Sequence, residues 1–243
     1  MKQGFFSIVT NERLAPATFR MVLAGETDAI TAPGQFVNIA LKGRFLRRPI
    51  SVCDWGKDRL TIIYKVVGGG TEQMSRMVPG EQLDLLTGLG NGYDLTKSGD
   101  KPLLIGGGAG VPPLFALAKH LLAQGKHPQA ILGFNRGEEC FLAEEFQALG
   151  VPVTIATADG SLGVKGFVTD AMPADGYTYL YTCGPEPMLR AIDAKAATGG
   201  QFSFEERMGC GFGACMGCTC KTKYGNKRIC REGPVLEREE IIW

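Results

Sequence analysis

Five of the eight cysteines in this 243-residue chain lie between Cys210 and Cys230. Cys210, Cys215 and Cys218 have the C-x4-C-x2-C spacing of a plant-type [2Fe–2S] loop, whose fourth thiolate comes later in the chain. This pattern restricts the end of the chain to a short loop wrapped around an iron–sulfur cluster. It also indicates a protein that carries single electrons.

Glycines separate these cysteines, at positions 211, 213 and 217. A loop that points backbone N–H groups at a cluster needs positive φ angles, which glycine adopts at low cost. We therefore expect Gly211, Gly213 and Gly217 to have positive φ.

Two cysteines compete for the fourth ligand position. Tyr224-Gly225-Asn226 predicts a hairpin, so Cys220 and Cys230 could face each other on paired strands. Cys218 and Cys220 would be adjacent positions on the same face of one strand. This spacing leaves too little chain between them for a loop that wraps a cluster. A zinc ribbon is the non-redox alternative, but it usually has two C-x2-C pairs, and only Cys215 and Cys218 have that spacing.

Charge and hydropathy exclude several classes of protein. Lys and Arg total 26 against 25 Asp and Glu, so no net charge indicates nucleic acid or acidic lipid as a partner. No apolar run is long enough for a membrane span or a signal peptide. We expect a cytoplasmic protein with reduced cysteines, in which cofactor ligation is favoured over disulfides.

Changes in the residue pattern along the chain predict three domains. Residues 1–98 contain short β-rich segments broken by Gly, Pro, Asn and Asp, typical of a small antiparallel β-barrel, with a helix expected at 74–78. Residues 99–200 alternate strands with helices, which predicts an α/β domain with a parallel sheet. Residues 201–243 hold the cysteines.

Two loops of the α/β domain are candidate nucleotide contacts. Gly106-Gly107-Gly108-Ala109-Gly110 follows a strand and precedes a helix with Pro112 and Pro113 in its first turn, a suitable place for a pyrophosphate. Cys183-Gly184-Pro185 ends a later strand at the edge where open α/β sheets bind ligands. Cys183 could face a nicotinamide ring or be a small buried residue.

The barrel region has two further candidates. Arg47-Arg48-Pro49-Ile50-Ser51 combines guanidinium groups with a hydroxyl, which can hold a phosphate. Gly68-Gly69-Gly70-Thr71 follows a strand and forms a second possible phosphate loop. Together these loops predict a bound dinucleotide.

The whole set resembles the ferredoxin reductase superfamily. More narrowly, it is similar to the electron-transfer subunits of NAD-dependent (class 1B) dihydroorotate dehydrogenases. The resemblance runs over essentially the full chain, through RRPIS, IYK, GGGAGVPPL, TADGSLGVKGFVTD, CGPEPML, SFEERMGCGFGACMGC and RICREGPV.

The resemblance implies FAD on the barrel, NAD on the α/β domain and [2Fe–2S] on the last domain. The implied flavin contacts are Arg48, Pro49, Ile50, Ser51, Ile63, Tyr64, Lys65, Gly70 and Thr71. The implied NAD contacts are Gly106, Gly107, Gly108, Gly110, Cys183, Gly184 and Pro185. The implied cluster ligands are Cys210, Cys215, Cys218 and Cys230, with Cys230 in the family's RIC position.

The resemblance also implies a function in pyrimidine biosynthesis. Electrons would pass from the FMN of a dihydroorotate-oxidising partner, in a heterotetramer with two copies of each subunit, through [2Fe–2S] and FAD to NAD⁺. Alternatives are a related subunit of a hydrogenase or of an NADPH-dependent ferredoxin oxidoreductase, and a non-enzymatic redox sensor. Arg136 could meet the 2′-phosphate of NADP, whereas the resemblance favours NAD.

Overall fold

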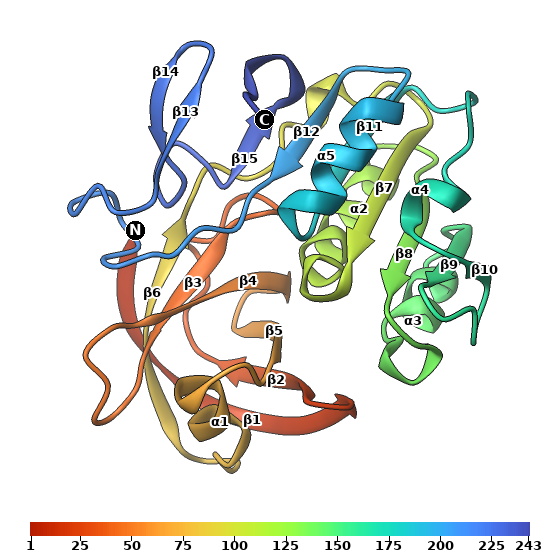
Figure 1. Ribbon diagram of the computed structural model, residues 1–243. Coiled ribbons are helices and arrows are strands. Elements are labelled where there is room, and N and C mark those ends of the chain that lie inside the picture. The colour runs from red at the N-terminus through yellow and green to blue at the C-terminus, as the bar shows by residue number, and fades with distance from the viewer.

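The first part of the chain forms a closed antiparallel barrel. The computed structural model describes residues 1–243, and six strands follow each other around the barrel in the order β1-β2-β5-β4-β3-β6 (Figure 1). They are β1 (Lys2–Ala15), β2 (Thr18–Ala24), β3 (Phe36–Ala40), β4 (Arg48–Trp55), β5 (Arg59–Lys65) and β6 (Gln82–Leu89). Alternate side chains, such as Val37 and Ile39, fill the interior. The barrel expected from the sequence is confirmed.

The helix of the barrel lies earlier than the sequence pattern predicts. It is α1 (Gly69–Ser75), not residues 74–78. The Thr71 hydroxyl accepts hydrogen bonds from the Val67 and Gly68 N–H groups, which fixes the first turn within the glycine run. The helix cannot extend to Pro79, because Val78, which precedes the proline, is disfavoured in the α conformation.

The second part is an open sheet with strand order β10-β9-β8-β7-β11-β12-β15 (Figure 1). All neighbouring strands are parallel except the pair β12 and β15. The strands are β7 (Pro102–Gly107), β8 (Gln129–Phe134), β9 (Val153–Thr157), β10 (Val164–Lys165), β11 (Tyr179–Cys183), β12 (Gly200–Ser203) and β15 (Val235–Glu237). The parallel α/β architecture is therefore confirmed.

Helices connect these strands. The helical elements are α2 (Pro112–Ala123), α3 (Ala143–Ala148), α4 (Val168–Ala171) and α5 (Glu186–Lys195), with the short 3-10 turns η1 (Leu95–Lys97), η2 (Gly108–Gly110), η3 (Gly137–Glu139) and η4 (Arg238–Glu240). The helix after β8 is shorter than the sequence suggests, because Leu142 has a φ of 66° and separates η3 from α3.

The cysteine segment is inserted between two strands of the same sheet. The chain leaves β12 at Ser203, forms the hairpin β13 (Thr219–Thr222) and β14 (Gly225–Arg228), and returns as β15. The division of the chain at 98/99 and 200/201 stays a prediction. Strands on both sides of the cysteine segment belong to one sheet.

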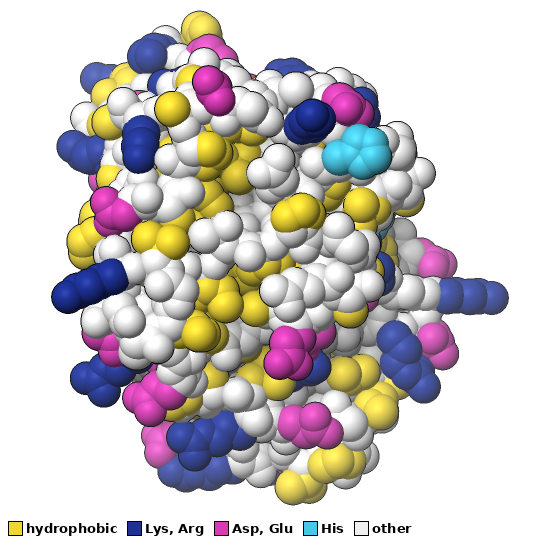
Figure 2. Space-filling view, turned by 90° about the vertical axis from the view of Figure 1, so that its right-hand side faces the viewer, with side chains coloured by type: hydrophobic (Ala, Val, Ile, Leu, Met, Phe, Trp, Pro, Cys, Tyr) yellow, Lys and Arg dark blue, Asp and Glu magenta, His cyan; other side chains and the backbone are white.

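The barrel and the sheet share a core. Cys53 and Ile63 of the barrel are buried with α2 and sheet residues, and Lys119 forms an ion pair with Asp54 at 2.6 Å. Lys and Arg are interspersed with Asp and Glu on the face in Figure 2, in keeping with the net charge of +1. No helix is long and apolar enough to span a bilayer.

Candidate functional site

Four cysteines of the inserted segment come together as two pairs. The Cys210 N–H lies 3.5 Å from Cys215 Sγ, and the Cys215 N–H lies 3.4 Å from Cys210 Sγ. The Cys230 N–H donates to Cys218 Sγ at 3.4 Å. No three His, Cys, Asp or Glu side chains are grouped to hold one metal ion. Each pair could supply the two thiolates that one iron of a [2Fe–2S] cluster takes.

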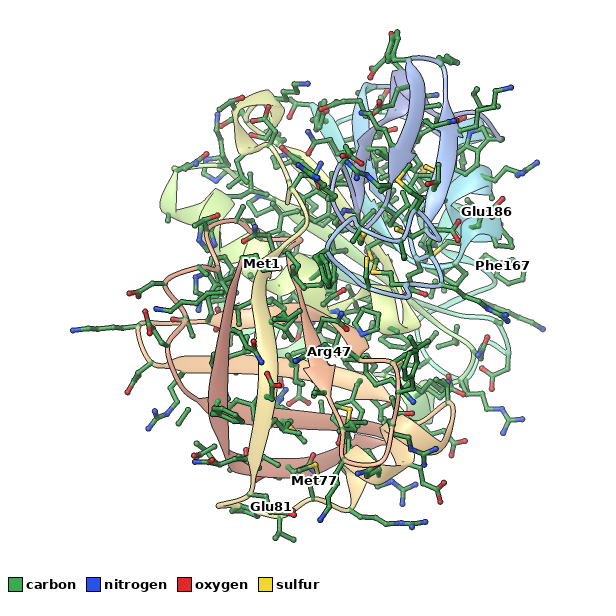
Figure 3. All side chains as sticks on the ribbon, turned by 90° about the vertical axis from the view of Figure 1, so that its left-hand side faces the viewer. Met1, Arg47, Met77, Glu81, Phe167 and Glu186 are labelled. Carbon is green, nitrogen blue, oxygen red and sulfur yellow. The ribbon has the colours of Figure 1, made fainter.

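The two pairs have different electrostatic surroundings. Partial burial opposes ionisation of Cys210, but hydrogen bonds from the N–H groups of Cys215, Phe212 and Ala214 outweigh it and lower the pKa of its thiol to about 6. Burial raises the pKa of Cys230 to about 12, with further contributions from Cys218 and from the charge of Cys210. Figure 3 shows sulfur atoms between the β13–β14 hairpin and the barrel.

Cys220 lies outside this group. It is on β13 opposite Lys227, so the predicted facing of Cys220 and Cys230 is wrong. The hairpin ends before Cys230, which is buried beneath it with Cys218. No hydrogen bond links Cys220 to another cysteine.

The loop conformation was only partly predicted from its glycines. Gly211 and Gly213 have φ of 79° and 93° as expected. Gly217 does not have a positive φ, and Met216 does instead, at 60°. Two further contacts fix the loop: Arg228 Nη1 donates to the Gly213 carbonyl at 2.6 Å and Arg228 Nε donates to Glu232 at 2.9 Å.

The candidate flavin residues of the barrel lie on neighbouring strands and the loop that follows them. Arg48, Pro49, Ile50 and Ser51 are all half-buried on β4, which pairs with β5. The Arg48 guanidinium packs on Gly70: a Cβ atom at Gly70 would lie 2.7 Å from its central carbon. Arg44, which the sequence reasoning missed, donates to the Gly69 carbonyl at 3.0 Å. Two guanidinium groups thus lie against the glycine loop, as a pyrophosphate site needs.

Three other candidates are placed differently. Tyr64 points into the barrel core, where its hydroxyl donates to Asn11 at 2.9 Å, so only its backbone remains for a ligand. The Thr71 hydroxyl is used within its own loop. Ile63 faces the sheet domain.

A cavity of about 570 Å³ lies between the barrel and the carboxyl ends of the sheet strands. Lys65 is the one lining residue from the barrel, and the other walls come from the sheet part, including Gly107, Gly108, Gly110, Gly184, Pro185, Phe167 and Glu205. Phe167 and Glu186 lie near one edge of the molecule in Figure 3. Burial raises the pKa of Glu205. Glu139 of η3 approaches Lys65 to 3.7 Å, which links the two parts at this cavity.

The two glycine motifs are in direct contact. Strands β7 and β11 are neighbours, with Gly106 opposite Cys183. A Cβ atom at Gly110 would lie 2.6 Å from the Gly184 nitrogen and closer still to the Cys183 carbonyl. Neither Gly106 nor Cys183 lines the cavity. Cys183 is buried in the shared core. Burial, with a smaller contribution from the charge of Glu205, raises its pKa to about 12 although a hydrogen bond with Ser203 opposes the shift.

Arg136 lies outside the cavity between the barrel and the sheet. It lines a second, open hollow with Glu138, Asp159 and Ser161, and its guanidinium is 3.7 Å from Glu138. The carboxylates of Glu138 and Asp159 therefore lie beside Arg136, the residue that the sequence suggests as a contact of the NADP 2′-phosphate.

Neither the Glu139–Lys65 contact nor the arginine pair on the glycine loop has a local signal in the sequence. Both join residues far apart in the chain, so only the folded structure brings them together.

Comparisons with known proteins agree with this geometry. Residues 205–242 match the family described as the iron-sulfur cluster binding domain of dihydroorotate dehydrogenase B. The electron transfer subunit of dihydroorotate dehydrogenase B (NAD(+)) from Bacillus pumilus is 41% identical, over 99% of this chain and 98% of that protein. The subunit of the same name from Fusobacterium nucleatum is 42% identical, over 99% of both.

Solved structures give the same picture. A chain of an NADH-dependent reduced ferredoxin-NADP oxidoreductase superposes with a TM-score of 0.89 at 28% identity, over 99% of this chain and 90% of that one. A ferredoxin NADP⁺ reductase from Neisseria gonorrhoeae with bound FAD and NADP, 15% identical, shares the fold over 80% of this chain and 90% of its own, with a TM-score of 0.70. The resemblance drawn from the sequence motifs is confirmed: the chain belongs to the family of dihydroorotate dehydrogenase B (NAD(+)) electron transfer subunits.

Proposed function

We propose that this chain passes electrons from a dihydroorotate-oxidising catalytic subunit that contains FMN to NAD⁺, as part of pyrimidine biosynthesis. The observation that carries the proposal is the cavity at the carboxyl ends of the sheet strands, which Lys65 of the barrel also lines and which reaches Glu205 at the start of the inserted cysteine segment. The cofactors supply the redox chemistry, since a [2Fe–2S] cluster carries single electrons and FAD links such carriers to two-electron exchange with NAD⁺.

The protein's own residues bind and orient these groups. Cys210 and Cys215 would hold one iron, and Cys218 and Cys230 the other. Pro49, Ile50 and Ser51, with the backbone of residues 63–65, would support the flavin, and Arg48 with Gly70 and the loop shaped by Thr71 would hold its pyrophosphate. In the cavity, Gly107, Gly108, Gly110, Gly184 and Pro185 would hold NAD, with Gly106 and Cys183 shaping the wall behind them.

Two observations refine the proposal. Glu138 and Asp159 near Arg136 repel a 2′-phosphate, which favours NAD over NADP. None of the eight cysteines forms a disulfide, which suits a cytoplasmic location. The assembly would be a heterotetramer of two copies of each subunit.

Co-purification with candidate partners tests the proposal. The chain should co-purify with an FMN-containing subunit. The complex should oxidise dihydroorotate to orotate and reduce NAD⁺. Absorption and EPR spectra should show one FAD and one [2Fe–2S] per chain. Recovery of a hydrogenase or a ferredoxin-dependent partner would contradict it. Failure of NADH to reduce bound FAD in the isolated chain would point to a redox sensor.

Replacing Arg48 with alanine is expected to weaken FAD binding. A hydrogen bond to a charged group contributes roughly 1.5–3 kcal/mol, so the dissociation constant should rise about tenfold or more. Flavin fluorescence on release measures it. Arg59→Ala, which removes an exposed arginine paired only with Asp58, is the control and should leave FAD affinity unchanged.

Replacing Arg228 with alanine is expected to loosen the cluster loop. It removes the donor to the Gly213 carbonyl and the ion pair with Glu232, whose strength is reflected in a Glu232 pKa lowered to about 2, mainly by hydrogen bonds from Arg228. Loss of such an outer contact typically costs roughly 10–100-fold in metal affinity. Iron release to a chelator, followed at the cluster's visible absorption, should accelerate. Lys221→Ala on the same hairpin should behave as the unmodified protein.

A further inference from the structure

Asn38 lies between the cysteine segment and the strands proposed to support the flavin. It is on β3 and only 1% exposed. Its neighbours Val37 and Ile39 fill the barrel, so Asn38 points outward, as does Phe36, which packs with Cys218 and Cys230.

The same outward face carries two of the proposed flavin residues, Pro49 and Ser51. Asn38 is directly opposite Pro49 in the β3–β4 pair, and Phe36 is opposite Ser51. Residues directly opposite each other in an antiparallel pair share a face of the sheet. Asn38 is therefore beside Pro49 and Ser51 on one side and the cysteine loop on the other.

One end of the Asn38 amide is engaged with the cysteine loop. Nδ2 donates to the main-chain carbonyl of Cys210 at 3.0 Å. Gly211 packs directly on this amide, because a Cβ atom there would lie 3.0 Å from Asn38 Cγ and nearer still to Nδ2. The orientation is fixed, since a carbonyl can only accept and must therefore face the NH₂ group.

The other end is buried with no protein partner. Asn38 Oδ1 is one of two buried side-chain polar atoms in the structure without a hydrogen bond. Leaving a buried acceptor unpaired is unfavourable, so such an atom calls for a specific explanation.

We propose that Asn38 is a positioning residue that joins the two cofactor sites, with Nδ2 holding the cluster loop and Oδ1 accepting a hydrogen bond from an N–H or O–H group of the bound flavin. The inference rests on the proposed function, because it needs FAD on the outward face of β4. It gives a single side chain the task of fixing the cluster loop and the flavin relative to each other.

Asn91 provides a matched control. This second asparagine also ties the barrel to the end of the cysteine segment, donating to the Glu232 and Val235 carbonyls and accepting from the Val235 N–H. Both ends of its amide are thus used by protein groups. Its loss should affect the segment without touching the flavin.

The experiment titrates FAD into the cluster-containing full chain after removal of flavin, and records the EPR spectrum of the reduced cluster. Asn38→Leu should weaken FAD binding roughly tenfold, as expected for one hydrogen bond, and should change the EPR spectrum. Asn91→Leu should leave FAD affinity within about twofold. Equal FAD affinity in the two variants would overturn the inference.

Asn38→Asp covers the case in which Asn38→Leu does not fold. It keeps the shape and an acceptor oxygen but lacks the NH₂ group, so FAD affinity should stay within about twofold while the EPR spectrum changes. Loss of FAD affinity, or an unchanged EPR spectrum, would contradict the assigned roles of the two amide ends. Absence of FAD binding in the unmodified chain would instead refute the proposed function.

Discussion

Cys230→Ser should yield a folded chain with FAD and little or no [2Fe–2S] cluster. Cys230 is paired with Cys218 and buried beneath the hairpin, and serine has nearly the same size but a much poorer ligand atom for iron. The loss should exceed the roughly 10–100-fold that removal of an outer-shell partner costs. Iron and sulfide analysis, with the EPR signal of the reduced protein, measures it.

Cys220→Ser is the decisive comparison for the fourth ligand. Cys220 is opposite Lys227 on the hairpin and shares no hydrogen bond with the other cysteines, so its replacement should leave iron content and the EPR signal intact. The reverse result, with iron lost in Cys220→Ser and kept in Cys230→Ser, would show that the proposed ligand set is wrong.

Gly110→Ala should disable the nicotinamide site and destabilise the sheet domain. The new methyl group would push against the Cys183 carbonyl and the Gly184 nitrogen, which are main-chain atoms and cannot rotate away. Overpacking of this kind costs about 1–3 kcal/mol. Urea unfolding measures the stability, and stopped-flow reduction of bound FAD by NADH should be severely slowed.

FAD should remain bound in Gly110→Ala, because its proposed contacts are in the barrel. Gly56→Ala is the matched control: Gly56 has open space around its Cα and no positive φ. It should unfold and react like the unmodified chain. Normal reduction by NADH in Gly110→Ala would show that the contact between the two glycine loops is dispensable.

Local patterns predicted most of the elements. Short β-rich segments broken by Gly, Pro, Asn and Asp predicted a barrel in residues 1–98, and the prolines at 112 and 113 marked the start of α2 correctly. Strand β6 was missed because its sequence is bracketed by Pro79-Gly80 and by glycines from Gly88 onward, which the pattern assigns to turns.

What the sequence could not predict depends on contacts between distant residues. Glycine at 217 suggested a positive φ, but Met216 adopts it instead, where the loop turns toward β13. Tyr64 was expected near the flavin, yet strand register directs its ring into the barrel. The role of Asn38 depends on a loop that comes 172 positions later in the chain.

The return of the chain through β15 has a consequence for how this protein can evolve and assemble. Strands β12 and β15 pair with each other. The iron-binding segment is therefore an insertion between two strands of one sheet and not a separate terminal domain. A deletion that runs from the iron-binding segment through β15 would leave one edge of β12 unpaired, a template for aggregation. Loss of the metal-binding function by such a deletion is therefore disfavoured.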